Sequence, residues 1–239
     1  MSGHSKWSTI KRKKGAADAK RGAVFTRLSK DITLAAREGG GAIDMNPALR
    51  LAVKKAKTSN MPSANIERAI KKGTGELPGI KYENFEYEGY GPHSVAILIE
   101  IMTDNKNRTL PEIRSIMTKN GGNLGESGCV NWMFEKKGIF TIQTTNIDED
   151  SLMELLENSN IEDIIFDESI FEIIVLSDDF KPVSTIFDKN NIDYDGEISL
   201  VPQNFIQLSL DEADKVIKLL ELIENHDDVQ KVHTNFQIK

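Results

Sequence analysis

The net charge of the chain changes sign near residue 75, and its hydrophobic periodicity changes at the same place. Residues 1–75 carry 17 Lys and Arg against 5 Asp and Glu, a net charge of +12, whereas residues 76–239 carry 13 against 32, a net charge of −19. Apolar residues recur every three to four positions before this point and in short, strand-length runs after it. We therefore expect a basic helical module followed by an acidic α+β body.

Three helices are predicted in the basic part. The first runs from about residue 16 to the glycines at 39–41, which end it. The second begins after Asn46, a favoured N-cap type followed by proline, and ends near residue 60. The third runs from about residue 63 to Gly73. Each helix has a narrow apolar stripe, so a small three-helix bundle with Lys- and Arg-rich outer faces is expected.

The acidic body is predicted to contain two sheets. Residues 74–81 have the composition of a linker. Residues 136–202 follow the order βαββαβ of a ferredoxin-like unit. Its strands are expected at 139–144, near 164, at 171–176 and at 197–201, and its helices at 148–158 and 179–190.

The segments on either side of this unit are expected to join into a second sheet domain. Before it, the pattern predicts strands at 95–102 and 130–134, with a helix between them capped by Thr109 and Glu112. After it, the pattern predicts a strand at 205–208, a helix with Ser209 and Glu212 as capping box, and a strand at 229–236.

The fold class expected is therefore α+β multidomain, with an N-terminal basic three-helix domain followed by two ferredoxin-like α+β domains, one inserted in the other. The predicted boundaries are 1–75 for the basic helical domain, 76–135 plus 203–239 for a discontinuous middle domain, and 136–202 for the inserted acidic domain.

No pattern in the chain indicates catalysis, a metal site or a cofactor. The four histidines lack paired metal-ligand spacing, and Cys129, the single cysteine, is interpreted as a buried, inert thiol in a strand. The glycine-rich segment 121–128 could bring backbone N–H groups onto a phosphate, but it follows a predicted helix, which favours helix termination and a turn. Acidic clusters fall at predicted helix starts or turns, where carboxylates act as caps. A non-enzymatic protein without a small-molecule substrate is expected.

The N-terminal basic run predicts a nucleic-acid interface. The alternatives are a solvated tail that only aids solubility and an anionic membrane surface, which the lack of a large apolar face disfavours. Trp7 offers a ring for base stacking beside the lysines, and further cations follow on the helices. The chain has no apolar run of membrane-spanning length, so a cytoplasmic location is expected. The predicted nucleic-acid-binding residues are His4, Lys6, Trp7, Lys11, Arg12, Lys13, Lys14, Lys20, Arg21, Arg27, Lys54, Lys55 and Lys57, and Lys30, Lys71 and Lys72 extend the same cationic faces.

Several segments also resemble the YebC family, also called the YebC/PmpR family. The resemblance spans nearly the whole chain, with one departure at Cys129, where the family commonly has serine. The segments that carry it are GHSKW (3–7), AADAKRG (16–22), GGG (39–41), NPALR (46–50), YEGYGP (87–92), DNKNRT (104–109), GGNLGESGCVNWMF (121–134) and DDVQKV (227–232). It implies a three-domain cytoplasmic bacterial protein without a catalytic role. Members are generally described as DNA-binding transcriptional regulators.

The residues do not decide between DNA and RNA as the target nucleic acid. The resemblance also extends to mitochondrial translational activators of cytochrome c oxidase and to bacterial members linked to ribosomes stalled on proline-rich sequences. No helix is rich in the Asn, Gln and Arg side chains that read base edges, so sequence-specific operator binding is not indicated by the residues. DNA and ribosomal RNA are both possible partners. A translation factor on the ribosome is the alternative function, and a protein-interaction adaptor is the third.

Overall fold

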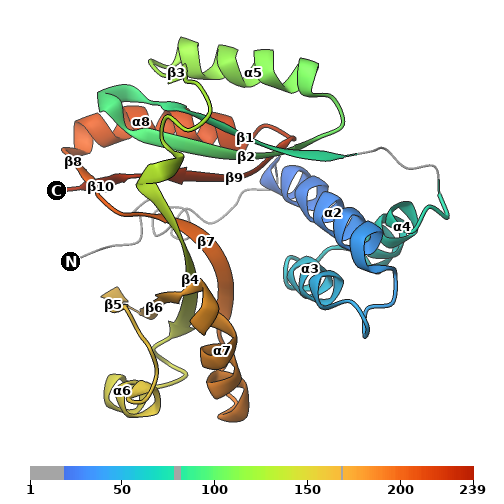
Figure 1. Cartoon of the computed structure of the whole chain (residues 1–239), viewed down its shortest axis with the longest axis vertical. Helices are drawn as coiled ribbons and strands as arrows, with labels where there is room; N and C mark the ends of the chain where they lie inside the picture. The colour runs from blue at the N-terminus through green and yellow to red at the C-terminus, as the bar shows by residue number, and fades with distance from the viewer. Residues whose placement is uncertain (1–18, 78–81, 168) are drawn as a thin grey trace. The chain divides into compact units, whose positions relative to one another are not determined.

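A computed structural model describes residues 19–77, 82–167 and 169–239 (Figure 1). These residues belong to two compact units. One unit comprises residues 132–207 and 235–238, and the other comprises the described parts of residues 19–131 together with residues 208–234 and Lys239. The basic helices and the first sheet thus fall in the same unit. The three domain boundaries expected from the sequence stay a prediction.

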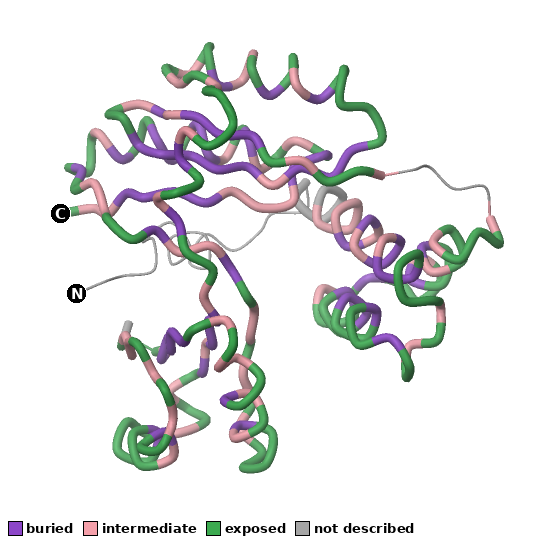
Figure 2. Tube along the Cα trace, in the orientation of Figure 1, coloured by how far each residue is buried: buried purple, intermediate pink, exposed green. Residues whose placement is uncertain are grey.

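The basic region forms the three expected helices, α2 (Ala19–Gly39), α3 (Pro47–Thr58) and α4 (Ser63–Gly73). Their apolar stripes face one another, as the purple segments of Figure 2 show, and bury a common core. Ile32, Leu49 and Ala56 are fully buried in it. The predicted helix number, order and ends are confirmed for the part of the region that the structure describes.

Asn46 joins the end of α2 to the start of α3. Its Nδ2 atom donates to the carbonyl oxygens of Ala35, at 2.7 Å, and Gly40, at 2.9 Å. Its Oδ1 atom accepts the N–H of Leu49 at 3.0 Å, so the predicted N-cap is confirmed. One buried side chain therefore satisfies orphan backbone groups at two helix ends.

Asn46→Ala should lower the free energy of unfolding by about 1–3 kcal/mol, because a cap is removed and the carbonyl group of the buried residue Ala35 loses a donor. Urea denaturation of the full chain measures this. Asn107→Ala, at an exposed position of another helix, is the matched control and should change stability by less than about 0.5 kcal/mol. Equal effects of the two substitutions would show that Asn46 does not stabilise the bundle.

The crossing of α2 and α4 depends on Gly73. A Cβ atom at Gly73 would lie 2.5 Å from the carbonyl oxygen of Thr33 and 2.6 Å from the Cβ of Ala36. The Thr33 hydroxyl also donates to the carbonyl oxygen of Ala69 at 3.1 Å. The two helices are therefore held in close contact at this end.

The first sheet has the strand order β3-β1-β2-β9. Its strands are β1 (Glu83–Tyr90), β2 (Ala96–Thr103), β3 (Asn123–Leu124) and β9 (Val229–Thr234). Helices α5 (Lys106–Lys119) and α8 (Leu210–Glu224) accompany it and contact each other. The capping box of Ser209 and Glu212 at α8 is confirmed.

The connections of this sheet differ from the expected ferredoxin-like order. β1 and β2 form an antiparallel hairpin closed by a 3-10 turn, η1 (Pro92–Ser94), and β1 also pairs with β3. The β1–β2 hairpin begins the domain, and α5 then joins β2 to β3 across β1. The order of the elements along the chain therefore differs from the expected βαβ-βαβ set, whereas the α+β fold class is confirmed. No strand was predicted before residue 95, so β1, and with it the hairpin, was missed.

Two local expectations in this region are also wrong. The N-cap of α5 is Asn105, whose Oδ1 accepts the N–H of Arg108 at 3.2 Å, and not Thr109. Thr109 lies inside the helix and is buried, and its hydroxyl donates to the carboxylate of Asp228. Residues 131–133 form a 3-10 turn, η2 (Asn131–Met133), where a strand was expected.

The second unit contains the predicted βαββαβ fold. Its four-stranded antiparallel sheet has the order β5-β6-β4-β7, the order of a ferredoxin-like sheet. Phe140 and Phe187 are fully buried between this sheet and its helices. The elements are β4 (Phe134–Gln143), α6 (Glu149–Leu156), β5 (Asp163–Asp167), β6 (Ile170–Leu176), η3 (Ser177–Asp179), α7 (Phe180–Lys189) and β7 (Asp195–Pro202). A separate pair, β8 (Ile206–Leu208) and β10 (Phe236–Ile238), forms a two-stranded sheet.

Candidate nucleic-acid interface

The sequence-predicted binding residues fall into three groups in the structure. His4, Lys6, Trp7, Lys11, Arg12, Lys13 and Lys14 lie outside the described residues. Lys20 and Arg21 belong to the first turn of α2, where only the backbone is described. The side chains of Arg27, Lys54, Lys55 and Lys57 are described and can be placed.

Helix α3 presents an exposed cationic stripe. Lys54 and Lys57, with Arg50 one turn earlier, are spaced by four and three residues and therefore share one face of the helix. All three are exposed, and none forms an ion pair within the described part of the chain. Lys55 is also exposed. The stripe is therefore available to an external anion.

Arg27 differs from the lysines of α3 because it is half-buried. Its Nε atom is buried and has no hydrogen-bond partner among the described residues. Burial lowers the pKa of its guanidinium, and the nearby carboxylates of Glu224, Asp227 and Asp31 oppose this shift. The charge of Arg27 is thus partly compensated by carboxylates of its own chain, unlike that of the exposed α3 stripe.

Lys30 was expected on the cationic outer face, and this expectation is wrong. The side chain is buried, and its Nζ atom donates to the carbonyl oxygens of Met102, at 3.0 Å, and Asp227, at 2.8 Å. It also forms an ion pair of 2.7 Å with Asp228 Oδ1. All three ammonium N–H groups are therefore used within the protein. The α2 face that carries Lys30 packs against the sheet domain.

Asp228 is the centre of a buried polar cluster. Besides Lys30, its carboxylate accepts from the hydroxyls of Thr103, at 3.0 Å, and Thr109, at 2.7 Å, and from Arg108 Nη2 at 2.8 Å. Burial alone raises the pKa of a carboxyl, but these donors outweigh it and hold the pKa of Asp228 far below its usual value. The segments DNKNRT and DDVQKV therefore meet in one structural cluster, and cations of the chain itself occupy this acidic site.

The glycine-rich segment is organised around a carboxylate. Glu88, which is buried in β1, accepts the backbone N–H groups of Gly128, at 2.6 Å, Val130, at 2.8 Å, and Asn131, at 2.7 Å. Burial raises the pKa of the Glu88 carboxyl, and the three N–H groups outweigh this and lower it. These amides thus bind an anion of the chain itself, which supports the turn interpretation and not a phosphate cradle.

Cys129 lies within this turn. It is half-buried and in a loop, so the expected strand is wrong. Burial and the neighbouring Glu88 carboxylate raise the pKa of its thiol, which is the environment of an unreactive cysteine.

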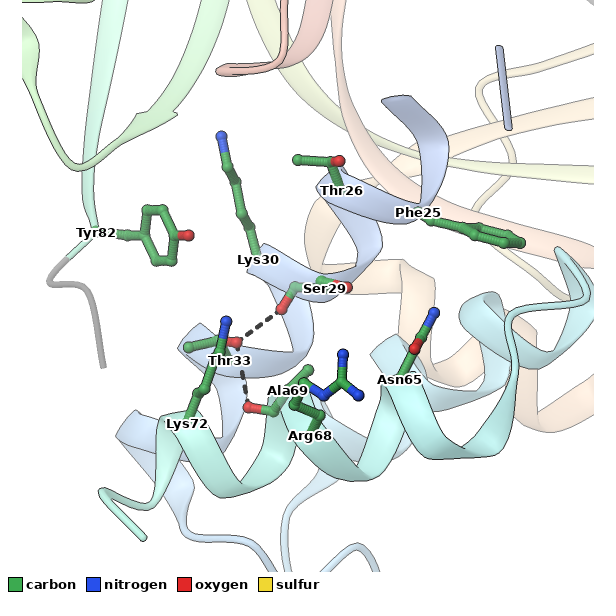
Figure 3. A pocket seen from close by; sticks show the side chains of 10 residues that line it. All are labelled: Phe25, Thr26, Ser29, Lys30, Thr33, Asn65, Arg68, Ala69, Lys72 and Tyr82. Atoms are coloured by element: carbon green, nitrogen blue, oxygen red, sulfur yellow. Dashed lines mark hydrogen bonds between the residues drawn. The ribbon is translucent and has the colours of Figure 1, made fainter. Parts of the chain in front are cut away.

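A groove between α2 and α4 is the most distinctive feature of the helical surface (Figure 3). Its volume is about 340 Å³, and Tyr82, at the entrance to the first sheet, lines one end while Phe25 lines the other. Asn65, Arg68 and Lys72 project from α4 along one side. Thr26 and Ser29 face them from α2.

The groove combines unpaired cations with aromatic rings. Arg68 and Lys72 are exposed, and neither has an ion-pair partner in the ranges that the structure covers. The Nζ atom of Lys30 lies over one face of the Tyr82 ring, 5.5 Å from its centroid. Phosphate oxygens suit the cations, and an unpaired base suits the rings.

Arg68, Asn65 and Tyr82 were not among the sequence-predicted binding residues. The spacing 65, 68, 72 places Asn65, Arg68 and Lys72 on one face of α4, so this part of the signal was present in the sequence. The position of Tyr82 beside them depends on packing and could not be read from spacing.

A metal centre and a membrane-spanning helix are both absent from the described ranges. No group of three or more His, Cys, Asp or Glu side chains in them could hold a metal ion. None of the helices in these ranges is long and apolar enough to cross a membrane.

Comparisons with known proteins agree with this architecture. The TACO1/YebC protein N-terminal domain matches residues 5–76, and the TACO1/YebC second and third domain matches residues 82–236. A solved structure of a conserved hypothetical protein from Aquifex aeolicus is 42% identical, with a TM-score of 0.83 over 93% of this chain and 92% of that chain.

Curated relatives match the full length of the chain. A protein of Syntrophobacter fumaroxidans is 52% identical over 240 residues, and one of Syntrophus aciditrophicus is 53% identical over 240 residues. In both cases the match covers 100% of this chain and 96% of the relative. Both relatives are named "Probable transcriptional regulatory protein". The chain belongs to the TACO1/YebC family.

Proposed function

We propose that this chain is a non-enzymatic regulator of gene expression that binds nucleic acid through its basic helical region. The observation that carries the proposal is the groove in which Arg68 and Lys72, both without an internal counter-ion in the described ranges, lie beside the Tyr82 ring. The α3 stripe of Arg50, Lys54 and Lys57 adds further cations. The basic residues of the first 15 positions and the +12 charge of residues 1–75 extend the same footprint.

The exposed cations suit backbone contacts better than base reading. Lysines bind phosphate as point charges, whereas base discrimination needs several Arg, Asn or Gln side chains directed at groove edges. In the described helical region only Asn65 and Arg68 line the groove with that chemistry. We therefore expect weak discrimination among duplex DNA sequences.

The groove favours a nucleic acid with unpaired nucleotides, and this is the reason for a second candidate function in translation. A ring such as Tyr82 can stack on a base only when the base is exposed, as in single-stranded or folded RNA. The names of the curated relatives support a role in transcription, and the groove supports an RNA target such as ribosomal RNA. The two functions differ in their preferred ligand.

The test is equilibrium binding of the full chain to three ligands of equal length: single-stranded RNA, a folded RNA hairpin with an unpaired loop, and duplex DNA. The double variant Arg68→Gln/Lys72→Gln should weaken binding to every ligand by about tenfold or more at moderate salt. Tyr82→Leu should weaken binding to the two RNAs and leave duplex DNA nearly unchanged, because only the stacking surface is removed.

The matched control removes two lysines from the other unit. Lys181 and Lys189 are exposed on α7, so Lys181→Gln/Lys189→Gln changes the net charge equally and should leave the affinity unchanged. If both double variants weaken binding alike, only net charge matters and the groove is not the site. Tight binding to one duplex sequence that is insensitive to Tyr82→Leu would instead favour an operator-binding function.

A further inference from the structure

The ferredoxin-like unit has the opposite charge from the helical region and cannot serve the same ligand. Residues 136–202 contain 4 Lys and Arg against 16 Asp and Glu, a net charge of −12. A surface of this charge repels nucleic acid and anionic membranes and attracts cationic partners. The unit therefore calls for a different kind of partner.

One side of this unit has a pocket of about 440 Å³ between α6 and β5. Leu152, Ile161 and Phe171 contribute to its apolar lining. Met153 and Phe166 also line it, although they remain 54% and 59% exposed. Large apolar side chains gathered in one pocket of a highly charged surface are typical of an interaction site.

Carboxylates line the pocket beside these apolar side chains. They belong to Glu149, Glu162 and Asp163, and Glu162 forms an ion pair of 2.8 Å with Lys137. Glu149 lies in the exposed first turn of α6. The pocket thus combines an apolar centre with an anionic rim, and the complementary ligand has an apolar anchor flanked by cations.

β5, the strand that lines this pocket, is an edge strand and can pair with an additional strand. β5 is at the end of the sheet order β5-β6-β4-β7, and among the strands that the structure describes it pairs with β6 alone. An edge strand can accept an extended peptide as an additional strand, and side chains that alternate along that peptide can reach the pocket. Phe166, which contacts the Phe171 ring at 5.5 Å between centroids, marks where an anchor side chain would insert.

We propose that this pocket binds an extended, Lys- and Arg-rich segment of a partner protein that inserts an apolar side chain beside Phe166 and Met153. The charge complementarity of the rim selects a cationic partner, and the edge strand selects an extended one. This inference does not depend on the proposed nucleic-acid function, because it concerns the other unit of the chain.

The test uses the full chain and a labelled twelve-residue peptide in which Lys or Arg alternates with Val or Phe. Binding should be saturable, and Phe166→Ser or Met153→Ser should each weaken it at least about tenfold, as expected for anchor positions. Ile198→Ser removes another exposed apolar side chain, 40% exposed on the opposite edge strand β7, and should leave binding unchanged.

Three results distinguish the proposal from its alternatives. A peptide of the same charge with Ser in place of Val and Phe should bind at least about tenfold more weakly, because it lacks the apolar anchor. Electrostatic attraction alone would bind both peptides equally. Equal binding of both peptides, or wild-type affinity of Phe166→Ser with an unchanged circular dichroism spectrum, overturns the proposal. A dimer of the chain that dissociates upon Phe166→Ser, seen by sedimentation, would assign the surface to a second copy and also overturn it.

Discussion

Asp228→Asn is expected to lower the free energy of unfolding at pH 7 by about 3–5 kcal/mol, because it leaves a buried ammonium group without its counter-ion. Lys30 and Asp228 are both buried, their charged atoms are 2.7 Å apart, and 198 positions of sequence separate the two residues. Removing the carboxylate also removes an acceptor for Thr109 and Arg108. Urea unfolding of the full chain at pH 7 measures the loss of stability.

The same variant should remove part of the acid sensitivity of the protein. The folded-state pKa of Asp228 lies far below the value of about 3.9 for an unfolded aspartate, so the unfolded chain binds the proton more readily. The stabilisation is thus complete above about pH 4 and is lost progressively as the pH falls below it. The difference in unfolding free energy between wild type and Asp228→Asn should therefore be smaller at pH 3 than at pH 6.

Asp104 provides the matched control. It is exposed and also forms an ion pair with Arg108, at 3.0 Å. As a surface pair, it should contribute less than about 1 kcal/mol, so Asp104→Asn should unfold close to wild type. If Asp228→Asn is as stable as Asp104→Asn, the cluster does not hold α2 to the sheet domain.

Glu88→Gln should have the second largest effect, a decrease in stability of about 2–4 kcal/mol, together with local opening of residues 125–131. A carboxylate can accept all three N–H groups that surround it, whereas the amide of glutamine directs two donors of its own into the same space. Hydrogen exchange at the Gly128, Val130 and Asn131 amides should become faster than elsewhere in the sheet. Urea unfolding gives the global decrease.

Glu86→Gln serves as the comparison for this variant, since Glu86 is exposed two residues earlier on the same strand. It should leave both stability and exchange at residues 128–131 unchanged. Slow exchange at these amides in Glu88→Gln would mean that other contacts hold the turn.

The features that could be predicted from the sequence are those with local signals. Asn46 followed by Pro47 marks the start of α3, and the glycines near residue 40 mark the end of α2. The alternation of strand and helix patterns in residues 136–202 was enough to give the ferredoxin-like order, because each element there has its own periodicity.

The features that were missed depend on contacts between distant segments. Lys30 follows Arg27 by three residues on α2, and nothing in the local pattern distinguishes it; only its ion pair with Asp228 makes it a buried structural residue. The β1–β2 hairpin brings Glu88 to a turn that lies 40 positions later in the chain. Within the groove, Arg68 and Lys72 follow helical spacing, but the nearness of Tyr82 is a result of packing. Tertiary burial, unlike local propensity, leaves little trace in a single sequence.

The salt dependence of nucleic-acid binding tests the central proposal most directly. The logarithm of the association constant for single-stranded RNA should fall linearly with the logarithm of salt concentration for the full chain. Arg68→Gln/Lys72→Gln should flatten this slope by about 1.4, near 0.7 for each phosphate that the variant no longer neutralises, and removal of residues 1–15 should flatten it further. The Lys181→Gln/Lys189→Gln control should retain the full slope. Slopes that are the same for all four proteins would contradict an electrostatic interface in residues 1–75.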